Sequence, residues 1–368
     1  MQIAKAKRLV VKVGSSILIG EKGSVRRDWF DSLAADIAAL AIRGTQIIVV
    51  TSGAVALGRS VLGIAAGPLK LEEKQAAAAC GQILLADAWR ECLGKHKLSC
   101  AQLLLTIDDS EDRRRYLNAR STLETLLEHG VIPVINENDT VATAELRFGD
   151  NDRLAARVAQ MASADQLVLM SDIDGLYTGN PHHDKNATRI AEVHEITPEI
   201  EAYAGASASE VGSGGMITKI IAAKIALAAG CNTVIASGKI NHPLKALEET
   251  GHGTWFISSS TPKSARKHWI SGAIAPAGVI TVDDGAAEAL KGGKSLLPAG
   301  VTKAEGRFER GDAVTIRDRQ GRELGKGLIA YGFEDAQRIL GHKSQDIEKI
   351  LGFKGRSALI HRDDLALR

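Results

Sequence analysis

The sequence predicts an α/β fold, a three-layer αβα sandwich with a mostly parallel sheet, followed by a small β-rich domain. Apolar runs of strand length alternate with helical patterns, glycines follow those helical patterns, and the pattern changes after residue 262. At 368 residues the chain also exceeds the ~250 to 300 residues at which one hydrophobic core usually stops growing. We therefore expect two domains.

The first domain is predicted from six apolar runs, at residues 9–13, 46–50, 102–105, 131–135, 167–170 and 233–236. Helical spacing of apolar residues occurs between most of these runs, at residues 28–43, 111–129 and 216–229. Gly44, Gly130 and Gly230 follow the three patterns as helix stops. Such alternation predicts a parallel sheet covered by helices on both faces, with ligands beyond the carboxyl ends of the strands.

The second domain is predicted from shorter strand patterns, at residues 279–282, 313–317 and 324–330. Gln320-Gly321 is expected to form the turn between the last two. The expected organisation is a first domain over residues 1–262, a linker over 263–276, a β-rich domain over 277–355 and a tail over 356–368.

Composition restricts the class of function. The formal charge of +2, from 46 basic and 44 acidic residues, gives no global field for nucleic acid or an anionic membrane. The 4 cysteines form no C-x-x-C pair and are predicted to be reduced, packed thiols. No segment is long enough to span a membrane, and no signal peptide pattern follows Lys5 and Lys7. We expect a cytoplasmic protein with a local anion site and no membrane partner.

A glycine-rich motif, Gly212-Ser213-Gly214-Gly215, precedes the helix predicted to begin near Met216. The unpaired N–H groups and the dipole of a helix start favour an anion there, and Lys219 lies in the first turn, where its ammonium could reach a phosphate. The alternative is a flexible linker before an ordinary helix. Ile217 stands where a dinucleotide fingerprint needs its third glycine, so the motif is not of that type.

Polar residues also follow the first two predicted strands. Lys12 interrupts the first strand and is followed by Gly14-Ser15-Ser16. The second strand ends in Thr51-Ser52-Gly53-Ala54, which offers hydroxyl and backbone donors to a phosphate or carboxylate. A lysine that snorkels to solvent and a simple helix N-cap are the respective alternatives.

Two clusters of acidic and amide residues follow the fourth strand, namely Asn136-Glu137-Asn138-Asp139 and Gly149-Asp150-Asn151-Asp152. Such side chains can bind the amino and carboxylate groups of an amino acid, whereas a plain turn with a helix cap is the alternative. Neither cluster has the alternating oxygen ligands of a calcium loop.

The fifth strand runs into Ser171-Asp172-Ile173-Asp174-Gly175, whose polar side chains suit a nucleotide or its Mg²⁺, unless Asp174-Gly175 is only a turn. Five polar clusters at strand ends are improbable by accident. No nucleophile pattern is needed, because phosphoryl transfer proceeds by positioning and electrostatics. The constellation indicates an ATP-dependent kinase that acts on a small carboxylate.

The motifs resemble those of the glutamate 5-kinase family of the amino-acid kinases, in order and along nearly the whole chain. Ser15, Ser171 and Ser213 stand where threonine is expected in many members, which keeps the hydroxyl. The resemblance implies the amino-acid kinase fold, with ATP binding, glutamate binding and catalysis, for residues 1–262. It implies a PUA-like domain for residues 277–355.

Site residues are implied by the same resemblance. Lys12 and Lys219 would bind ATP and stabilise the transferring phosphoryl group as catalytic residues, and Asp152 would orient both lysines. The residues expected to hold L-glutamate are Ser52, Asp139 and Asn151. The nucleotide is expected to contact Lys12, Ser171, Asp172, Ser213, Gly214, Gly215, Met216, Ile217, Thr218 and Lys219. No metal-ligating residue is expected, since Mg²⁺ would be held mainly through the ATP phosphates.

The implied reaction transfers the γ-phosphoryl group of ATP to the γ-carboxylate of L-glutamate, giving L-glutamyl 5-phosphate and ADP at the start of proline synthesis. Proline is expected as an inhibitor, and a homo-oligomer is expected. The alternatives are another carboxylate or carbamate kinase of this fold and an RNA-binding regulatory protein. Arg317, Arg319 and Arg322 cluster near the predicted turn, but interleaved acidic residues and few aromatics favour a solvated hairpin over an RNA site.

Overall fold

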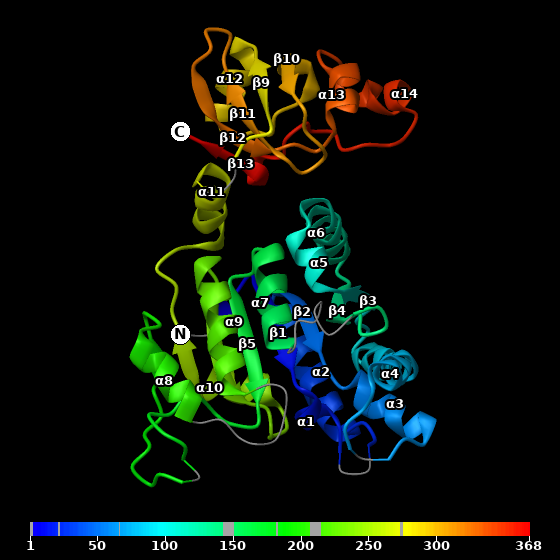
Figure 1. The fold of residues 1–368 in the computed structure, drawn as a ribbon, viewed down its shortest axis with the longest axis vertical. Coiled ribbons are helices and arrows are strands. Elements are labelled where there is room, and N and C mark those ends of the chain that lie inside the picture. Colours follow the sequence, from blue (N-terminus) through cyan, green and yellow to red (C-terminus); the bar gives the residue numbers. More distant parts are fainter. Residues whose placement is uncertain are drawn as a thin grey trace. The chain divides into compact units, whose positions relative to one another are not determined.

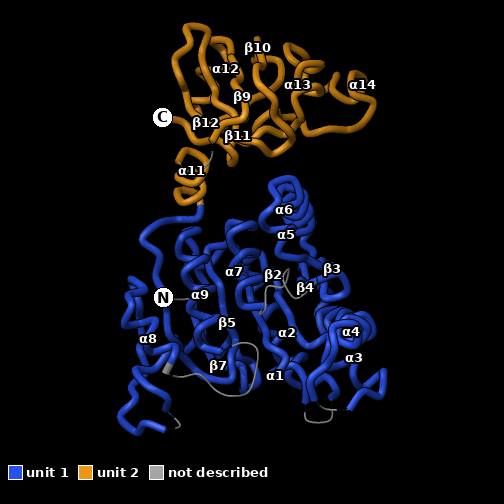
Figure 2. Tube along the Cα trace, in the orientation of Figure 1, with its two compact units in different colours: residues 1–262 blue, residues 263–368 orange. Residues whose placement is uncertain are grey.

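The computed structural model describes residues 3–20, 23–65, 67–142, 151–181, 183–206, 215–272 and 275–368. The chain divides into two compact units, Met1–Pro262 and Lys263–Arg368 (Figure 2). Each unit contains its own sheet and its own hydrophobic core. No helix in the described ranges is long and apolar enough to cross a membrane.

The first unit is built on an eight-stranded sheet with the strand order β3-β4-β2-β1-β5-β7-β8-β6. The strands are β1 (Arg8–Val13), β2 (Gln46–Thr51), β3 (Cys100–Leu105), β4 (Ile132–Glu137), β5 (Gln166–Ser171), β6 (Glu192–Val193), β7 (Asn232–Ser237) and β8 (Thr254–Phe256). Neighbouring strands pair in parallel except β7 with β8. All six predicted strands are present, and the prediction of a mostly parallel sheet is confirmed.

Helices cover both faces of this sheet (Figure 1). They are α1 (Ser15–Leu18), α2 (Arg27–Ile42), α3 (Ala54–Leu62), α4 (Leu71–Gly94), α5 (Ile107–Glu111), α6 (Arg113–Glu128), α7 (Asn151–Met161), α8 (Pro198–Ala206), α9 (Met216–Ala228) and α10 (Pro243–Thr250). Leu9, Val11 and Val13 of β1 share one core with α2, α4 and α10, whereas Val10 shares the other with α6, α7 and α9. Alternate side chains of a strand point to opposite faces of the sheet, so these two cores lie on opposite faces, each covered by helices. The prediction of a three-layer αβα sandwich is therefore confirmed.

The helix predicted over residues 111–129 corresponds to α6, and the short helix α5 before it was not predicted. Asp112 has an extended backbone (φ −69°, ψ 121°), and its carboxylate accepts a hydrogen bond from the backbone N–H of Arg115 at 2.8 Å. Asp112 is therefore the N-cap of α6, which separates this helix from α5. The predicted helix stops are confirmed at Gly44, Gly130 and Gly230, whose φ angles of 89°, 69° and 77° are left-handed.

Helices α3 and α4 cross at two glycines. A Cβ atom on Gly58 would lie 1.7 Å from the carbonyl oxygen of Ala77, and one on Gly81 would lie 1.8 Å from that of Ala54. Since no larger residue fits at either position, the two backbones pack in direct contact. This crossing holds α4 close to the end of β2, because α3 begins only three residues after that strand.

The second unit contains a five-stranded sheet with the order β10-β9-β11-β12-β13. Its strands are β9 (Gly278–Val282), β10 (Val301–Gly306), β11 (Ala313–Arg317), β12 (Glu323–Leu328) and β13 (Leu365–Leu367), and its helices are α11 (Pro262–Gly272), α12 (Asp284–Lys291), α13 (Phe333–Ile339) and α14 (Ile347–Leu351). Only β9 and β11 pair in parallel among these described strands. The prediction of a small β-rich domain is confirmed, and the turn at Gln320-Gly321 joins β11 to β12.

Two segments of this unit differ from expectation. Most of the expected linker, residues 263–276, belongs to helix α11, and the expected tail, residues 356–368, contributes strand β13 to the sheet. Arg266 on α11 donates to a carboxylate oxygen of Asp364 at 2.5 Å, with both side chains nearly buried. These elements depend on partners far away in the sequence, 98 residues for the Arg266–Asp364 pair and 42 for the pair of Gly325 with Leu367, so local patterns did not predict them.

Candidate functional site

The candidate site lies at the carboxyl edge of the first sheet. Strands β4, β2, β1, β5 and β7 are consecutive neighbours that pair in parallel, so their carboxyl ends meet at one edge. Helices α7 and α9 begin at the same edge, because Asn151 and Lys219 in their first turns contact residues there. The positive ends of two helix dipoles therefore face this region.

Three charged side chains form a lysine–aspartate cluster, Lys12, Asp152 and Lys219. The ammonium Nζ of Lys12 lies 2.6 Å from Oδ1 of Asp152, and that of Lys219 lies 2.9 Å from Oδ2. Asp152 is fully buried, and each lysine is only 5% exposed. Strand β1 and helices α7 and α9 thus bring together residues that are up to 207 positions apart in the sequence.

The electrostatics of the cluster depend on this geometry. Burial by itself raises the pKa of Asp152, but the charges and hydrogen bonds of Lys12 and Lys219 outweigh that effect and lower it well below its usual range. The carboxylate is therefore ionised at neutral pH. Two ammonium groups share one carboxylate, so these three side chains carry a formal charge of +1 (2 − 1). Such a site attracts a phosphate and stabilises negative charge that develops during its transfer.

Four uncharged side chains form a second group, the amide network, consisting of Gln82, Asn136, Asn151 and Ser52. Nδ2 of Asn151 donates to the carbonyl oxygen of Thr51 (2.6 Å), to Oγ of Ser52 (2.9 Å) and to Oδ1 of Asn136 (2.8 Å). Nδ2 of Asn136 in turn donates to Oε1 of Gln82 at 2.8 Å. Asn151 and Asp152 are adjacent in sequence, so the network adjoins the lysine–aspartate cluster.

Ser171 and Asp172, two of the residues expected to contact the nucleotide, stand at the end of β5, which pairs with the strand that carries Lys12. Ser171 ends β5 and donates through Oγ to a carboxylate oxygen of Asp172 at 3.1 Å. A Cβ atom on Gly14 would lie 3.8 Å from Nζ of Lys12, so the lysine ammonium reaches the small-residue turn after β1.

Helix α9 begins with a partly buried first turn, in which Ile217 is exposed. Gly215 is its N-cap, and Oγ1 of Thr218 lies 2.7 Å from the Gly215 carbonyl oxygen. Met216 is buried while Ile217 is 48% exposed, so these two residues would offer a ligand chiefly their backbone and the Ile217 side chain. The expected contacts at Ser213 and Gly214 lie outside the described residues, as do Gly149 and Asp150 of the second acidic cluster.

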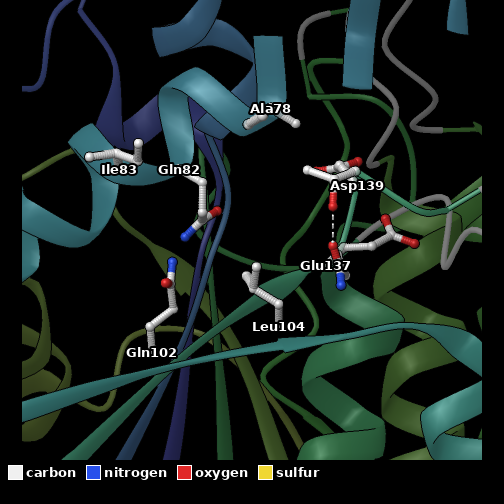
Figure 3. Close-up of a pocket in the computed structure, with 10 residues that line it drawn as sticks. Ala78, Gln82, Ile83, Gln102, Leu104, Glu137 and Asp139 are labelled. Atoms are coloured by element: carbon white, nitrogen blue, oxygen red, sulfur yellow. Dashed lines mark hydrogen bonds between the residues drawn. The ribbon is translucent and has the colours of Figure 1, made fainter. Parts of the chain in front are cut away.

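Asp139 lies in the turn after β4 and lines a pocket of about 240 Å³. Figure 3 shows this pocket between α4, which contributes Ala78 and Gln82, and the segment that carries Glu137 and Asp139. Oγ1 of Thr140 donates to Oδ1 of Asn138 at 2.6 Å and so braces the turn. No group of three or more His, Cys, Asp or Glu side chains that could hold a metal ion occurs among the described residues.

Two members of the amide network were not predicted as site residues. Asn136 belongs to an acidic-amide motif that the sequence does reveal, but nothing distinguishes it there from its neighbours. Gln82 lies in the middle of a long helix and meets Asn136 across 54 residues of sequence. The only local signal is its position after Gly81, since a glycine within a helix often marks close packing.

Comparison with known proteins gives the family. Residues 7–237 match the amino acid kinase family, and residues 278–351 match the PUA domain. The first match covers well over half of the chain and contains strands β1 to β7, the lysine–aspartate cluster and the amide network described above.

Relatives match along the whole length. The chain is 62% identical to a glutamate 5-kinase of Paramagnetospirillum magneticum, over 99% of each chain. It is 58% identical to one of Agrobacterium fabrum, over 99% of this chain and 94% of the relative. Among solved structures, a carbamate kinase from Giardia lamblia bound to AMP-PNP shares the fold (TM-score 0.50, 16% identity, 70% of this chain and 100% of that one). The chain belongs to the amino acid kinase family and, within it, to the glutamate 5-kinases with a C-terminal PUA domain.

Proposed function

We infer that this chain transfers the γ-phosphoryl group of ATP to the γ-carboxylate of L-glutamate, the first step of proline biosynthesis. The observation that carries this inference is the buried lysine–aspartate cluster, on a chain that matches glutamate 5-kinases over its full length. A carboxylate oxygen of glutamate attacks the γ-phosphorus while the bond to the β,γ-bridging oxygen breaks. The products are L-glutamyl 5-phosphate and ADP.

The lysine–aspartate cluster supplies the electrostatic part of this reaction. We propose that Lys12 and Lys219 contact the transferring phosphoryl group and neutralise the negative charge that spreads over its oxygens. Asp152 contacts neither substrate in this scheme. It holds both ammonium groups at 2.6 and 2.9 Å, so that they need not reorganise when charge develops.

The glutamate is proposed to lie between this cluster and the amide network. Ser52, Asn151 and Asp139 would hold its amino and α-carboxylate groups, which leaves the γ-carboxylate directed at Lys12 and Lys219. Ser52 and Asn151 are joined by a hydrogen bond of 2.9 Å, which supports their acting on the same substrate.

The nucleotide is proposed to bind along Ser171, Asp172 and residues 213–219, of which 216–219 form the first turn of α9. Gly215 and the first turn of α9 provide backbone N–H groups at the positive end of a helix, which suits phosphate oxygens. Mg²⁺ bound to the ATP phosphates would neutralise phosphate charge. Because Mg²⁺ keeps several water ligands, it needs few protein ligands of its own.

The acceptor can be tested by trapping the product. The chain is incubated with ATP, Mg²⁺ and one candidate acid, and hydroxylamine converts any acyl phosphate into a coloured hydroxamate. L-glutamate is expected to give product, and L-aspartate, N-acetyl-L-glutamate and carbamate are expected to give none. Product from one of these acids and none from glutamate would contradict the proposal.

Proline is proposed to inhibit the reaction by binding across the residues that hold the substrate L-glutamate. Proline titrated against initial rates should raise the apparent KM for glutamate, and undiminished activity would exclude this regulation. A homo-oligomer is also proposed, which sedimentation velocity at several protein concentrations would measure.

RNA binding by the second unit is the alternative role, since residues 278–351 match the PUA domain. Of the three arginines near the β11–β12 turn, Arg322 is already paired with Asp318 at 2.7 Å, which favours a solvated hairpin instead. A gel-shift series over salt concentration decides between them, because binding through phosphates weakens steeply as salt rises. Saturable binding at low salt without kinase turnover would favour the regulatory role.

A further inference from the structure

We propose that Gln82 is a positioning residue which holds Asn136 against Asn151 in the orientation that two backbone groups impose. It thereby keeps Oδ1 of Asn151 toward the substrate, where that oxygen favours acids with an α-ammonium group. The inference rests on the proposed function and adds a residue on α4 that binds neither substrate. It also assigns Oδ1 of Asn151 to the α-ammonium group of the substrate.

Two backbone groups of fixed polarity orient the network. The carbonyl oxygen of Thr51 can only accept a hydrogen bond, so the Asn151 group 2.6 Å away must be Nδ2. The backbone N–H of Glu137 can only donate, so the Asn136 atom 2.9 Å away must be Oδ1. Nδ2 of Asn136 then faces Gln82, which must present Oε1. The geometry thus fixes the orientation of three amides.

This orientation decides what Asn151 can offer a ligand. Its Nδ2 carries two hydrogens and is surrounded by three acceptors, Thr51 O, Ser52 Oγ and Asn136 Oδ1, so no hydrogen is left for a substrate. No group in the described part of the chain donates to Asn151 Oδ1. The atom available to the substrate is therefore an acceptor, which suits an ammonium and repels a carboxylate.

Ser52 has the complementary role. Its Oγ accepts a hydrogen bond from Asn151, so its hydroxyl hydrogen is left to donate. A donor at Ser52 and an acceptor at Asn151 match the α-carboxylate and α-ammonium of one amino acid. If the amide of Asn151 turned over, two nitrogen donors and a hydroxyl would face the ligand, and the preference for an ammonium would be lost.

Gln82 can hold this orientation because its own position is fixed. It follows Gly81, where α4 packs directly against α3, and Figure 3 shows its amide end turned into the pocket beside β3 and β4. Asn136, the residue that it holds, is only 2% exposed, so water competes little for its Nδ2. A hydrogen bond in such surroundings is costly to lose.

The test compares Gln82→Met with wild type. Methionine keeps about the length of the side chain but replaces the amide oxygen that accepts from Asn136 with a thioether, which is only a weak acceptor. The KM for L-glutamate is expected to rise about tenfold, the effect of one buried hydrogen bond, while kcat and the KM for ATP stay within about twofold. Glutarate, which lacks only the α-amino group, is used as a competitor. Its inhibition constant should stay within about twofold, because it does not use Asn151 Oδ1.

The matched control is Gln102→Met. Gln102 on β3 lines the same pocket as Gln82 but is exposed and has no hydrogen bond to Asn136. The Gln102→Met substitution should therefore leave kcat, the KM values for glutamate and ATP, and the inhibition constant of glutarate unchanged. Thermal unfolding of both variants shows whether they fold. An unchanged glutamate KM in a folded Gln82→Met variant, or an equal weakening of glutamate and glutarate, would overturn the inference. Absence of glutamate phosphorylation by the wild-type chain would instead overturn the proposed function.

Discussion

The lysine–aspartate cluster and the amide network lie side by side at one sheet edge, yet they are built on opposite principles. The cluster places three ionised groups where water is nearly excluded, so its effect on a transferring phosphate is strong. The network contains no ionised group, and its polarity is set by the backbone of Thr51 and Glu137. Under the proposed function, charge lies where charge develops in the reaction, whereas neutral amides lie where the substrate is oriented.

The largest effect is expected for Asp152→Asn. Both ammonium groups share this carboxylate, and removing one partner of a buried ion pair typically costs about 3 to 5 kcal/mol. The free energy of unfolding, measured with urea at pH 7, should fall by that order. Asp87→Asn is the control, because its pair with Arg90 is exposed and should contribute no more than about 1 kcal/mol. Equal losses for the two variants would contradict the role given to the cluster.

The same carboxylate predicts a dependence on pH. The pKa of Asp152 in the folded chain lies below its ordinary value of 3.8, so its ionised form stabilises the fold above that pH, and the stabilisation is lost as the pH falls toward the folded pKa. The stability gap between wild type and Asp152→Asn should therefore be constant from pH 8 to about pH 5 and shrink below about pH 4. Urea unfolding of both chains at each pH measures it. A stability gap that widens on acidification would show that folding does not lower the pKa of Asp152.

Next in size is Lys219→Ala, which removes one of the two charges proposed to contact the phosphoryl group. We expect kcat to fall by about 10² to 10³, the usual loss for one donor to developing charge. Lys224→Ala is the control, since Lys224 lies five residues further along α9 and its ion pair with Glu201 is at the surface. Near wild-type turnover by Lys219→Ala would refute the catalytic role.

The smallest effect is expected for Thr51→Val, which tests whether the Thr51 side chain stabilises the fold without orienting the substrate. Thr51→Val removes the hydroxyl that accepts from the indole N–H of Trp89 at 3.2 Å, and both side chains are fully buried. An unsatisfied buried donor should lower the free energy of unfolding by about 1 to 3 kcal/mol. The KM for glutamate should change less than about twofold, because Asn151 bonds the backbone of Thr51 and not its side chain. A tenfold rise in that KM would show that the hydroxyl also orients the substrate.

Much of the fold was predictable because its signals are local. The six predicted strands are short apolar runs, and the helix stops at Gly44 and Gly130 follow from the conformational freedom of one residue type. Short edge strands such as β6, the helix α11 and the terminal strand β13 were not predicted. Their sequences are weakly patterned, and they form because a partner strand or an ion pair is already in place.

For the site, the residue types at the strand ends could be read from the sequence, since Lys12, Ser52, Asn151 and Asp152 belong to motifs along the chain. The pairing of Asp152 with two lysines, and the contact of Gln82 on α4 with Asn136 on β4, became visible only in the folded chain. A motif fixes the chemistry of a side chain, whereas its partner and the direction of its hydrogen bonds depend on backbone groups that folding brings from distant parts of the sequence.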